Sequence, residues 1–162
     1  MLDGIDEVMD AAELPVAKES RQAPVDGSVC VDGAAFSYVA GHPVLRGVSL
    51  AVPDRKMVAI VGPSGCGKTT IIKLIARFHD VDEGAIRVGG VDVRDLATED
   101  LFKQVSFVFQ DVYLFNDTLR GNVLIANPQA TEDELQEAVA LAGVTEIVER
   151  LPEGWETVCK EG

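Results

Sequence analysis

The chain has 162 residues, of which 47% are hydrophobic and 25% charged, which suits one globular domain with a core and excludes a disordered chain. No apolar run reaches the roughly 18 residues that cross a bilayer, and no signal peptide is recognised. The net charge of -13 comes without a basic stripe, so nucleic acid is not an expected partner. The widely spaced Cys30, Cys66 and Cys159 argue against a disulfide framework or zinc site.

The first third of the chain predicts a linker followed by short strands. Residues 1–12 are expected to form a short helix, and residues 13–28 a linker interrupted by prolines and glycine. Strands are expected over residues 29–38, 44–46 and 48–53. Because tight turns separate these strands, the sequence predicts an antiparallel sheet.

A glycine-rich segment follows. Residues 57–61 are apolar and β-branched, which predicts a short buried strand. Residues 62–69, G-P-S-G-C-G-K-T, fit the pattern G-x-x-x-x-G-K-[ST], and the apolar residues of 71–78 recur at helical spacing. Strand, loop and helix in this order are the context that a phosphate-binding loop requires.

The residue types of this loop suit a polyphosphate. Gly62, Gly65 and Gly67 allow backbone N–H groups to approach phosphate closely, and the following helix adds its positive end. Lys68 offers a charge to the β- and γ-phosphates, and Thr69 offers a hydroxyl to Mg²⁺. The sequence therefore predicts nucleotide-phosphate binding; the alternative is a glycine turn that precedes a helix.

The rest of the chain alternates short strands and helices. Gly89-Gly90 predicts a hairpin between residues 85–88 and 91–93. Thr98 is expected to cap a short helix that reaches Lys103, and residues 105–109 to form a second buried strand that ends at Gln110. Thr118 is expected to begin another helix. A capping box over residues 131–134 opens a helix that Gly143 ends, and residues 145–151 form the last one.

Four stretches together resemble the ATP-binding cassette, the nucleotide-binding domain of ABC transporters, and most closely its exporter type. They are V-D-G-A-A-F-S-Y ending at Tyr38, G-P-S-G-C-G-K-T-T, V-S-F-V-F-Q-D-V-Y-L-F-N-D-T-L-R-G-N-V, and T-E-D-E-L through L-P-E-G-W-E-T-V. The resemblance implies an α/β fold: a P-loop NTPase (RecA-like) core, an antiparallel β-subdomain and the beginning of a helical subdomain from about residue 131. Residues 1–27 would be a linker or the end of a preceding transmembrane region, and residues 28–162 an incomplete nucleotide-binding domain.

The resemblance also implies a set of ligand contacts. Tyr38 would stack on adenine, Ser64 and Thr70 would reach the γ- and α-phosphates, and Gln110 would join Thr69 as a Mg²⁺ ligand and sense the γ-phosphate. Lys68 would stabilise charge in the transition state. The implied ATP and Mg²⁺ site consists of Tyr38, Gly62, Pro63, Ser64, Gly65, Cys66, Gly67, Lys68, Thr69, Thr70 and Gln110.

Two protein partners are implied as well. The apolar loop of Val112, Tyr113, Leu114 and Phe115 would meet the transmembrane domain of a transporter. A second nucleotide-binding domain would close over the ATP. Such a domain would lie at the cytoplasmic face of the plasma membrane, and the sequence does not indicate the transported substrate.

The sequence departs from the family at three places. Residues 54–56 replace a turn that often has glycine, and residues 159–161 replace a common Gly-Glu. The signature, Walker B and switch-histidine motifs are not in the 162 residues, and His42 and His79 are expected to be ordinary turn or surface residues. The chain alone is therefore expected to bind ATP without significant hydrolysis, and to be marginally stable.

Three other functions remain open from the sequence. One is a different P-loop enzyme, such as a small-molecule kinase or GTPase. Another is a non-catalytic module that binds a membrane partner through residues 113–115. The third is a soluble cassette that pairs with a separate permease.

Overall fold

The computed structural model describes residues 14–15, 17–110 and 113–159. The helix expected over residues 1–12 lies outside the described residues, as does Val112. The chain divides into two compact units, residues 1–107 and residues 108–162, and each is described by itself.

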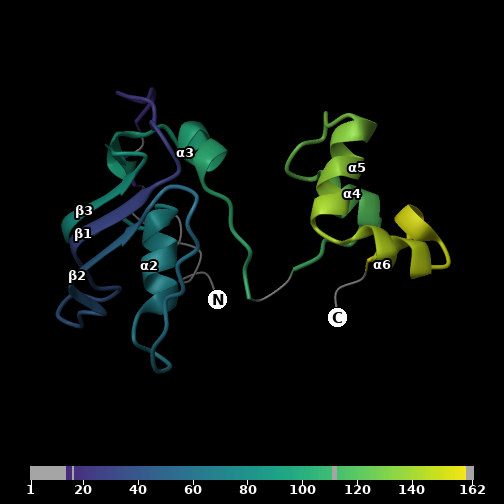
Figure 1. The fold of residues 1–162 in the computed structure, drawn as a ribbon. Helices are drawn as coiled ribbons and strands as arrows, with labels where there is room; N and C mark the ends of the chain where they lie inside the picture. Colours follow the sequence, from purple (N-terminus) through teal and green to yellow (C-terminus); the bar gives the residue numbers. More distant parts are fainter. Residues whose placement is uncertain (1–13, 16, 111–112, 160–162) are drawn as a thin grey trace, which may run out of the picture. The chain divides into compact units, whose positions relative to one another are not determined.

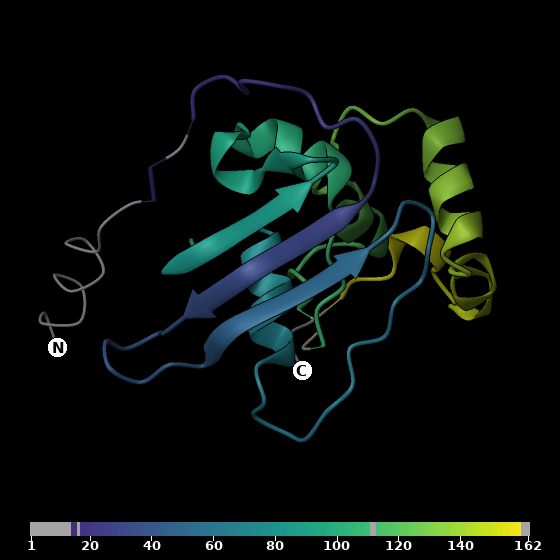
Figure 2. The ribbon, with the colours of Figure 1, turned by 60° about the vertical axis from the view of Figure 1, so that its left-hand side comes forward.

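The first unit is built on a four-stranded antiparallel sheet with the strand order β2-β1-β3-β4 (Figures 1 and 2). The strands are β1 (Val29–Phe36), β2 (Leu45–Val52), β3 (Glu83–Val88) and β4 (Val91–Asp92). This confirms the predicted antiparallel sheet. The two strands expected over residues 44–46 and 48–53 are in fact one, because Gly47 adopts a left-handed conformation (φ 68°) that keeps the strand continuous across a shift in register.

The β3–β4 hairpin turns at Gly89 and Gly90, as predicted. Both have positive φ, 53° and 81°, which is the requirement of a two-residue type I′ turn. Asp92 then caps the 3-10 helix η1 (Val93–Asp95) by accepting from the Arg94 amide at 2.9 Å. Burial raises the pKa of Asp92, but the hydrogen bonds and charge of Arg94 outweigh it, and the pKa is lowered.

Helix α2 (Lys68–Ile75) lies against this sheet (Figure 1). Its buried residues Ile71 and Leu74 pack in one core with Val31 and Ile86 from the strands. The apolar pattern predicted a helix to residue 78, but the helix ends earlier in a Schellman motif, in which the Phe78 amide donates to the Lys73 carbonyl at 2.9 Å.

Hydrogen bonds fix the segment before β1 to the rest of the first unit. Helix α3 (Thr98–Gln104) begins at the N-cap Ala97, whose amide donates to Ser20 Oγ at 2.9 Å, so Thr98 is not the cap that the sequence predicted. No side chain of the described residues caps the first-turn amides of α3, and Ser20 holds the residue at which the helix begins. Arg77 Nη2 donates to the Pro15 carbonyl at 2.6 Å, and the Val25 amide donates to the Gly89 carbonyl at 3.1 Å.

The two buried strands predicted over residues 57–61 and 105–109 are not formed. Both segments lack regular secondary structure, and Met57 and Val108 are each 99% exposed. A parallel strand receives its hydrogen bonds only from neighbours distant in sequence, and no strand in the described residues pairs with either segment. An apolar, β-branched composition is therefore not sufficient to make them strands here.

The described residues of the second unit form four short helical elements. They are α4 (Leu119–Leu124), α5 (Glu132–Leu141), α6 (Thr145–Arg150) and the 3-10 helix η2 (Gly154–Glu156). Thr118, where a helix was expected to begin, is the N-cap of α4. The predicted Thr131–Glu134 capping box is present, and Gly143 (φ 69°) follows α5 as expected. The buried apolar residues of these helices are Leu135, Val139 and Val148.

Candidate phosphate-binding site

The loop of residues 62–67 has two positions with a left-handed backbone that favours glycine. Gly65 and Gly67 have φ values of 78° and 93°. A Cβ at Gly67 would lie 2.7 Å from Leu45 Cδ2, and a Cβ at Gly62 would lie 2.8 Å from Cys66 Sγ. The loop therefore needs glycine at 67 for its dihedral angles and for space, and at 62 for space alone.

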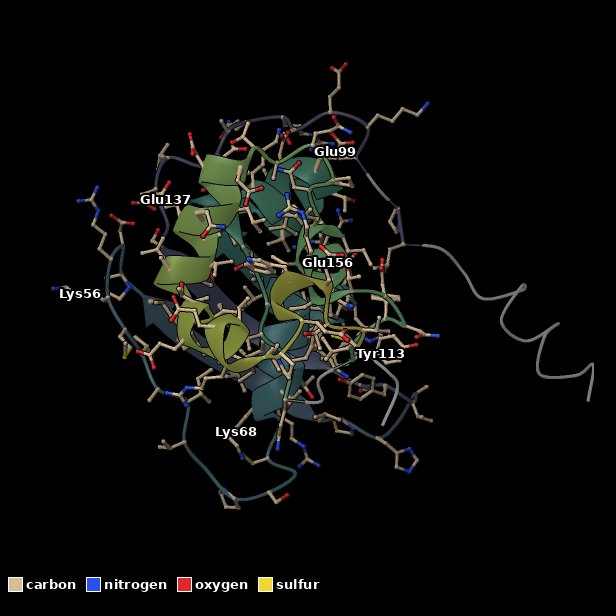
Figure 3. The ribbon with its side chains drawn as sticks, turned by 90° about the vertical axis from the view of Figure 1, so that its right-hand side faces the viewer. Lys56, Lys68, Glu99, Tyr113, Glu137 and Glu156 are labelled. Atoms are coloured by element: carbon tan, nitrogen blue, oxygen red, sulfur yellow. The ribbon has the colours of Figure 1, made fainter. Side chains whose placement is uncertain are left out.

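The Lys68 side chain turns back into the bend of this loop (Figure 3). Its ammonium donates to the carbonyls of Gly62 at 2.9 Å and Pro63 at 2.6 Å. Cys66 Sγ lies 3.7 Å from the same nitrogen. These contacts hold a full positive charge where the loop and helix α2 meet.

The first turn of α2 adds backbone donors beside this charge. The Ile71 amide donates to the Gly67 carbonyl at 3.0 Å, but no acceptor among the described residues takes the amides of Lys68, Thr69 or Thr70. Such amides, together with the helix dipole, favour a bound anion. Thr69 and Ser64 are exposed, whereas Thr70 is buried.

Tyr38 lies beside the same helix. Its hydroxyl donates to Thr70 Oγ1 at 3.3 Å, and 48% of the residue is exposed. Its ring packs edge-on with those of Phe36 and His79, at centroid distances of 4.9 and 5.3 Å. The structure thus brings together the residue expected at adenine and a residue expected at the α-phosphate.

The remaining candidate residues belong to the second unit. Gln110 is exposed and does not follow a formed strand. Tyr113 and Phe115 have their ring centroids 5.1 Å apart, and Figure 3 labels Tyr113. Asn122 of α4 accepts from the Phe115 amide at 2.7 Å and donates to the Phe115 carbonyl at 3.0 Å, so a helix fixes this exposed loop.

The chemistry of the first-unit site fits a polyphosphate with a hard cation. Backbone amides and one ammonium suit phosphate oxygens, and the Thr69 hydroxyl is an oxygen ligand of the kind Mg²⁺ accepts beside phosphates. The described ranges contain no group of three or more His, Cys, Asp or Glu that could hold a metal ion. A cation here would therefore take most of its negatively charged ligands from the phosphates.

Sequence reasoning missed three residues that shape these surfaces. His79 was expected to be an ordinary turn or surface residue, yet it packs on Tyr38. Arg77 follows helix α2 in a left-handed conformation. A sequence predicts this conformation at the end of a helix only where it has glycine or asparagine. Asn122 three residues after the start of α4 gave no signal, because its partners are backbone groups of the preceding loop.

Comparison with known proteins places the chain in a family. A family model described as ABC transporter matches residues 45–157. The mycobactin import ATP-binding/permease protein IrtA of Mycobacterium tuberculosis is 43% identical over 154 residues, covering 93% of this chain and 18% of the relative. The mitochondrial iron-sulfur clusters transporter atm1 of Aspergillus fumigatus is 40% identical over 149 residues, covering 92% of this chain and 20% of the relative.

A solved structure agrees with these matches. A bacterial Atm1-family ABC exporter with ATP bound superposes with a TM-score of 0.85 and 32% identity, covering 99% of this chain and 29% of that one. The chain belongs to the ABC transporter family and corresponds to the ATP-binding domain of its exporter type. The resemblance and the P-loop NTPase fold class predicted from the sequence are thereby confirmed. The chain spans about a fifth of the length of the curated relatives named above.

Proposed function

We propose that this chain binds ATP with Mg²⁺ at the loop of residues 62–70 and serves as the energy-supplying domain of a membrane transporter. The observation that carries the proposal is the Lys68 ammonium, held on the carbonyls of Gly62 and Pro63 beside the first amides of α2. On phosphate binding, Lys68 exchanges these carbonyls for phosphate oxygens, which are stronger, charged acceptors.

The other loop residues orient the nucleotide. Tyr38 stacks on the adenine ring, Ser64 contacts the γ-phosphate, and Thr70 contacts the α-phosphate. Thr69 would hold Mg²⁺, which would neutralise charge on the phosphates when bound. Tyr38 suits this role because half of the residue is exposed while its hydroxyl is tied to Thr70.

Two protein partners complete the proposed function. The exposed loop of Tyr113, Leu114 and Phe115, held by Asn122 and continuing from Val112, contacts the transmembrane domain. A second nucleotide-binding domain closes over the ATP. With these partners the chain would lie at the cytoplasmic face of a membrane. No helix in the described ranges is long and apolar enough to cross one itself.

ATP hydrolysis also requires a base that orients the attacking water. The Walker B and switch-histidine motifs, from which the family resemblance would draw this base, are not among the 162 residues. We therefore expect the 162-residue polypeptide to bind ATP without turning it over at the rate of an intact cassette.

Radiolabelled ATP binding to the wild-type chain and to Lys68→Ala tests the proposal. A charge-assisted contact contributes about 1.5–3 kcal/mol, so the affinity should fall by at least about tenfold. Lys73→Ala is the matched control, because it removes the same charge from the same helix without touching the loop. Circular dichroism shows whether each variant keeps its fold.

Three results would contradict this proposal: no ATP binding by the wild type, an unchanged affinity in Lys68→Ala, or equal losses in the two lysine variants. A wild-type chain that binds no ATP but still captures a transmembrane domain through residues 113–115 would instead support the non-catalytic interaction module.

A further inference from the structure

The rings of Phe36, Tyr38 and His79 form a cluster beside helix α2, and Tyr38 is the residue proposed to stack on adenine. The His79 ring centroid is 5.3 Å from that of Tyr38, with the planes at 88°, and 5.4 Å from that of Phe36. Phe36 and Tyr38 are themselves 4.9 Å apart with planes at 85°. Each ring therefore contacts the other two, and Tyr38 is the most exposed of them.

The end of helix α2 places His79 in this cluster. Arg77 occupies the left-handed position of the Schellman motif (φ 57°), and this reverses the chain immediately before Phe78 and His79. The Arg77 guanidinium then pairs with Asp80 at 3.0 Å, and only 7% of the Arg77 side chain is exposed. Because residues 77 and 80 are both anchored, the backbone of His79 between them has little freedom.

One hydrogen bond also holds the Tyr38 side chain. Its hydroxyl donates to Thr70 Oγ1 at 3.3 Å, a long bond that by itself leaves the ring free to turn about its own axis. Edge-to-face packing restricts this rotation, because an aromatic pair has a preferred interplanar geometry. Phe36 is buried in strand β1, whereas His79 is half-buried and follows helix α2.

We propose that His79 is a positioning residue for nucleotide binding: with Phe36 it holds the Tyr38 ring in the orientation that receives the adenine base. This rests on the proposed function, in which Tyr38 stacks on the base. His79 touches Tyr38 rather than the phosphates, so it contributes to recognition of the base and not of the polyphosphate chain.

The test compares two ligands that share the phosphate contacts. Affinities of Mg-ATP and of magnesium tripolyphosphate are measured by titration calorimetry for the wild type and for His79→Ala. Loss of an aromatic pair should weaken ATP binding by about 2- to 10-fold and leave tripolyphosphate binding unchanged. His79→Phe should restore ATP affinity because it keeps a ring at this position.

Two further variants separate positioning from a general loss of structure. His42→Ala changes the other histidine, which is exposed in the turn after Tyr38, and should leave both affinities unchanged. Adding His79→Ala to Tyr38→Ala should cause no additional loss, because the ring to be positioned is gone.

The possible failures are distinct. If the wild type binds neither ligand, the proposed function fails, and the role of His79 fails with it. If the wild type binds both ligands but His79→Ala weakens neither, or weakens both equally, only the inference about His79 is overturned. An ATP loss in His79→Ala that persists at full size in the Tyr38→Ala background overturns it as well.

Discussion

Residues with a left-handed backbone conformation determine where the chain can turn in this domain. Gly67 combines a φ of 93° with a position where an added Cβ would lie 2.7 Å from Leu45 Cδ2, so a larger residue would be strained and would displace the Leu45 side chain. Arg55 and Arg77 hold similar conformations, with φ 54° and 57°, although a side chain costs about 1 kcal/mol at such a position. Arg55 lies in the turn of residues 54–56, so this turn forms at a cost in backbone strain.

Cys66 lies where its reactivity should depend on whether the phosphate loop is occupied. It is exposed, and its Sγ lies 3.7 Å from the Lys68 ammonium. We expect maleimide to label Cys66, and Mg-ATP to slow this labelling because the phosphates would cover the loop. Mass spectrometry of tryptic peptides measures the rate at each cysteine.

Cys30 provides an internal control for this experiment. It is exposed on β1, outside the loop, so its labelling rate should not change with nucleotide. Equal rates at Cys66 with and without Mg-ATP would count against binding at this loop, provided that the nucleotide is present above its dissociation constant.

At the scale of elements, features defined by neighbouring residues could be predicted from the sequence. The hairpin follows from Gly89-Gly90, and the ends of helix α5 from the Thr131–Glu134 capping box and Gly143. Each depends on backbone conformations that a few adjacent residues determine. The glycine pattern of residues 62–67 and the lysine after it belong to this class, which is why the centre of the candidate site could be located.

Features that depend on distant partners could not be predicted in this way. Residues 57–61 and 105–109 have the composition of strands, but strand formation requires a neighbour to supply hydrogen bonds. Helix α3 begins at Ala97 rather than at a Thr98 cap, and the amide of Ala97 donates to Ser20, far away in the sequence. His79 likewise joins the site only because Arg77 turns the chain after α2.

Arg77 connects the phosphate-loop helix to the segment that precedes the sheet. Its guanidinium donates to the Pro15 carbonyl at 2.6 Å and pairs with Asp80 at 3.0 Å. Arg77→Ala should remove these bonds while keeping the left-handed strain, whereas Arg77→Gly should remove both. We therefore expect Arg77→Gly to be the more stable of the two variants by about 1 kcal/mol, and both to be less stable than the wild type.

Urea unfolding followed by circular dichroism gives the two stabilities, and limited trypsin digestion tests the connection itself. Cleavage after Lys18 and Arg21 should be faster in both variants, because the segment that contains them has lost an anchor at Pro15. Unchanged cleavage would show that the other contacts of Ser20 and Val25 are sufficient, and a less stable Arg77→Gly would contradict the role of strain.

At the scale of the whole chain, charge and apolar surface are unevenly distributed. Residues 31–129 carry eleven acidic and ten basic residues, so most of the net charge of -13 lies towards the two ends. The near-neutral middle contains the phosphate loop and both apolar segments that the sequence predicted as strands. Electrostatic repulsion between copies of the chain is therefore weakest where the exposed apolar surface is greatest.

That distribution predicts self-association of the isolated 162-residue chain. Met57, Val61 and Val108 are 99%, 85% and 99% exposed, and apolar extended segments without strand partners pair readily with other chains. Sedimentation velocity should show oligomers that increase with concentration, together with a broad thermal transition. Val61→Lys and Val108→Lys should shift the population towards monomer without changing the far-ultraviolet spectrum. Val25→Lys, at an exposed position before β1, should leave the oligomer population unchanged. A wild-type chain that remains monomeric and melts in one sharp transition would contradict this prediction, since it would require those side chains to be covered in solution.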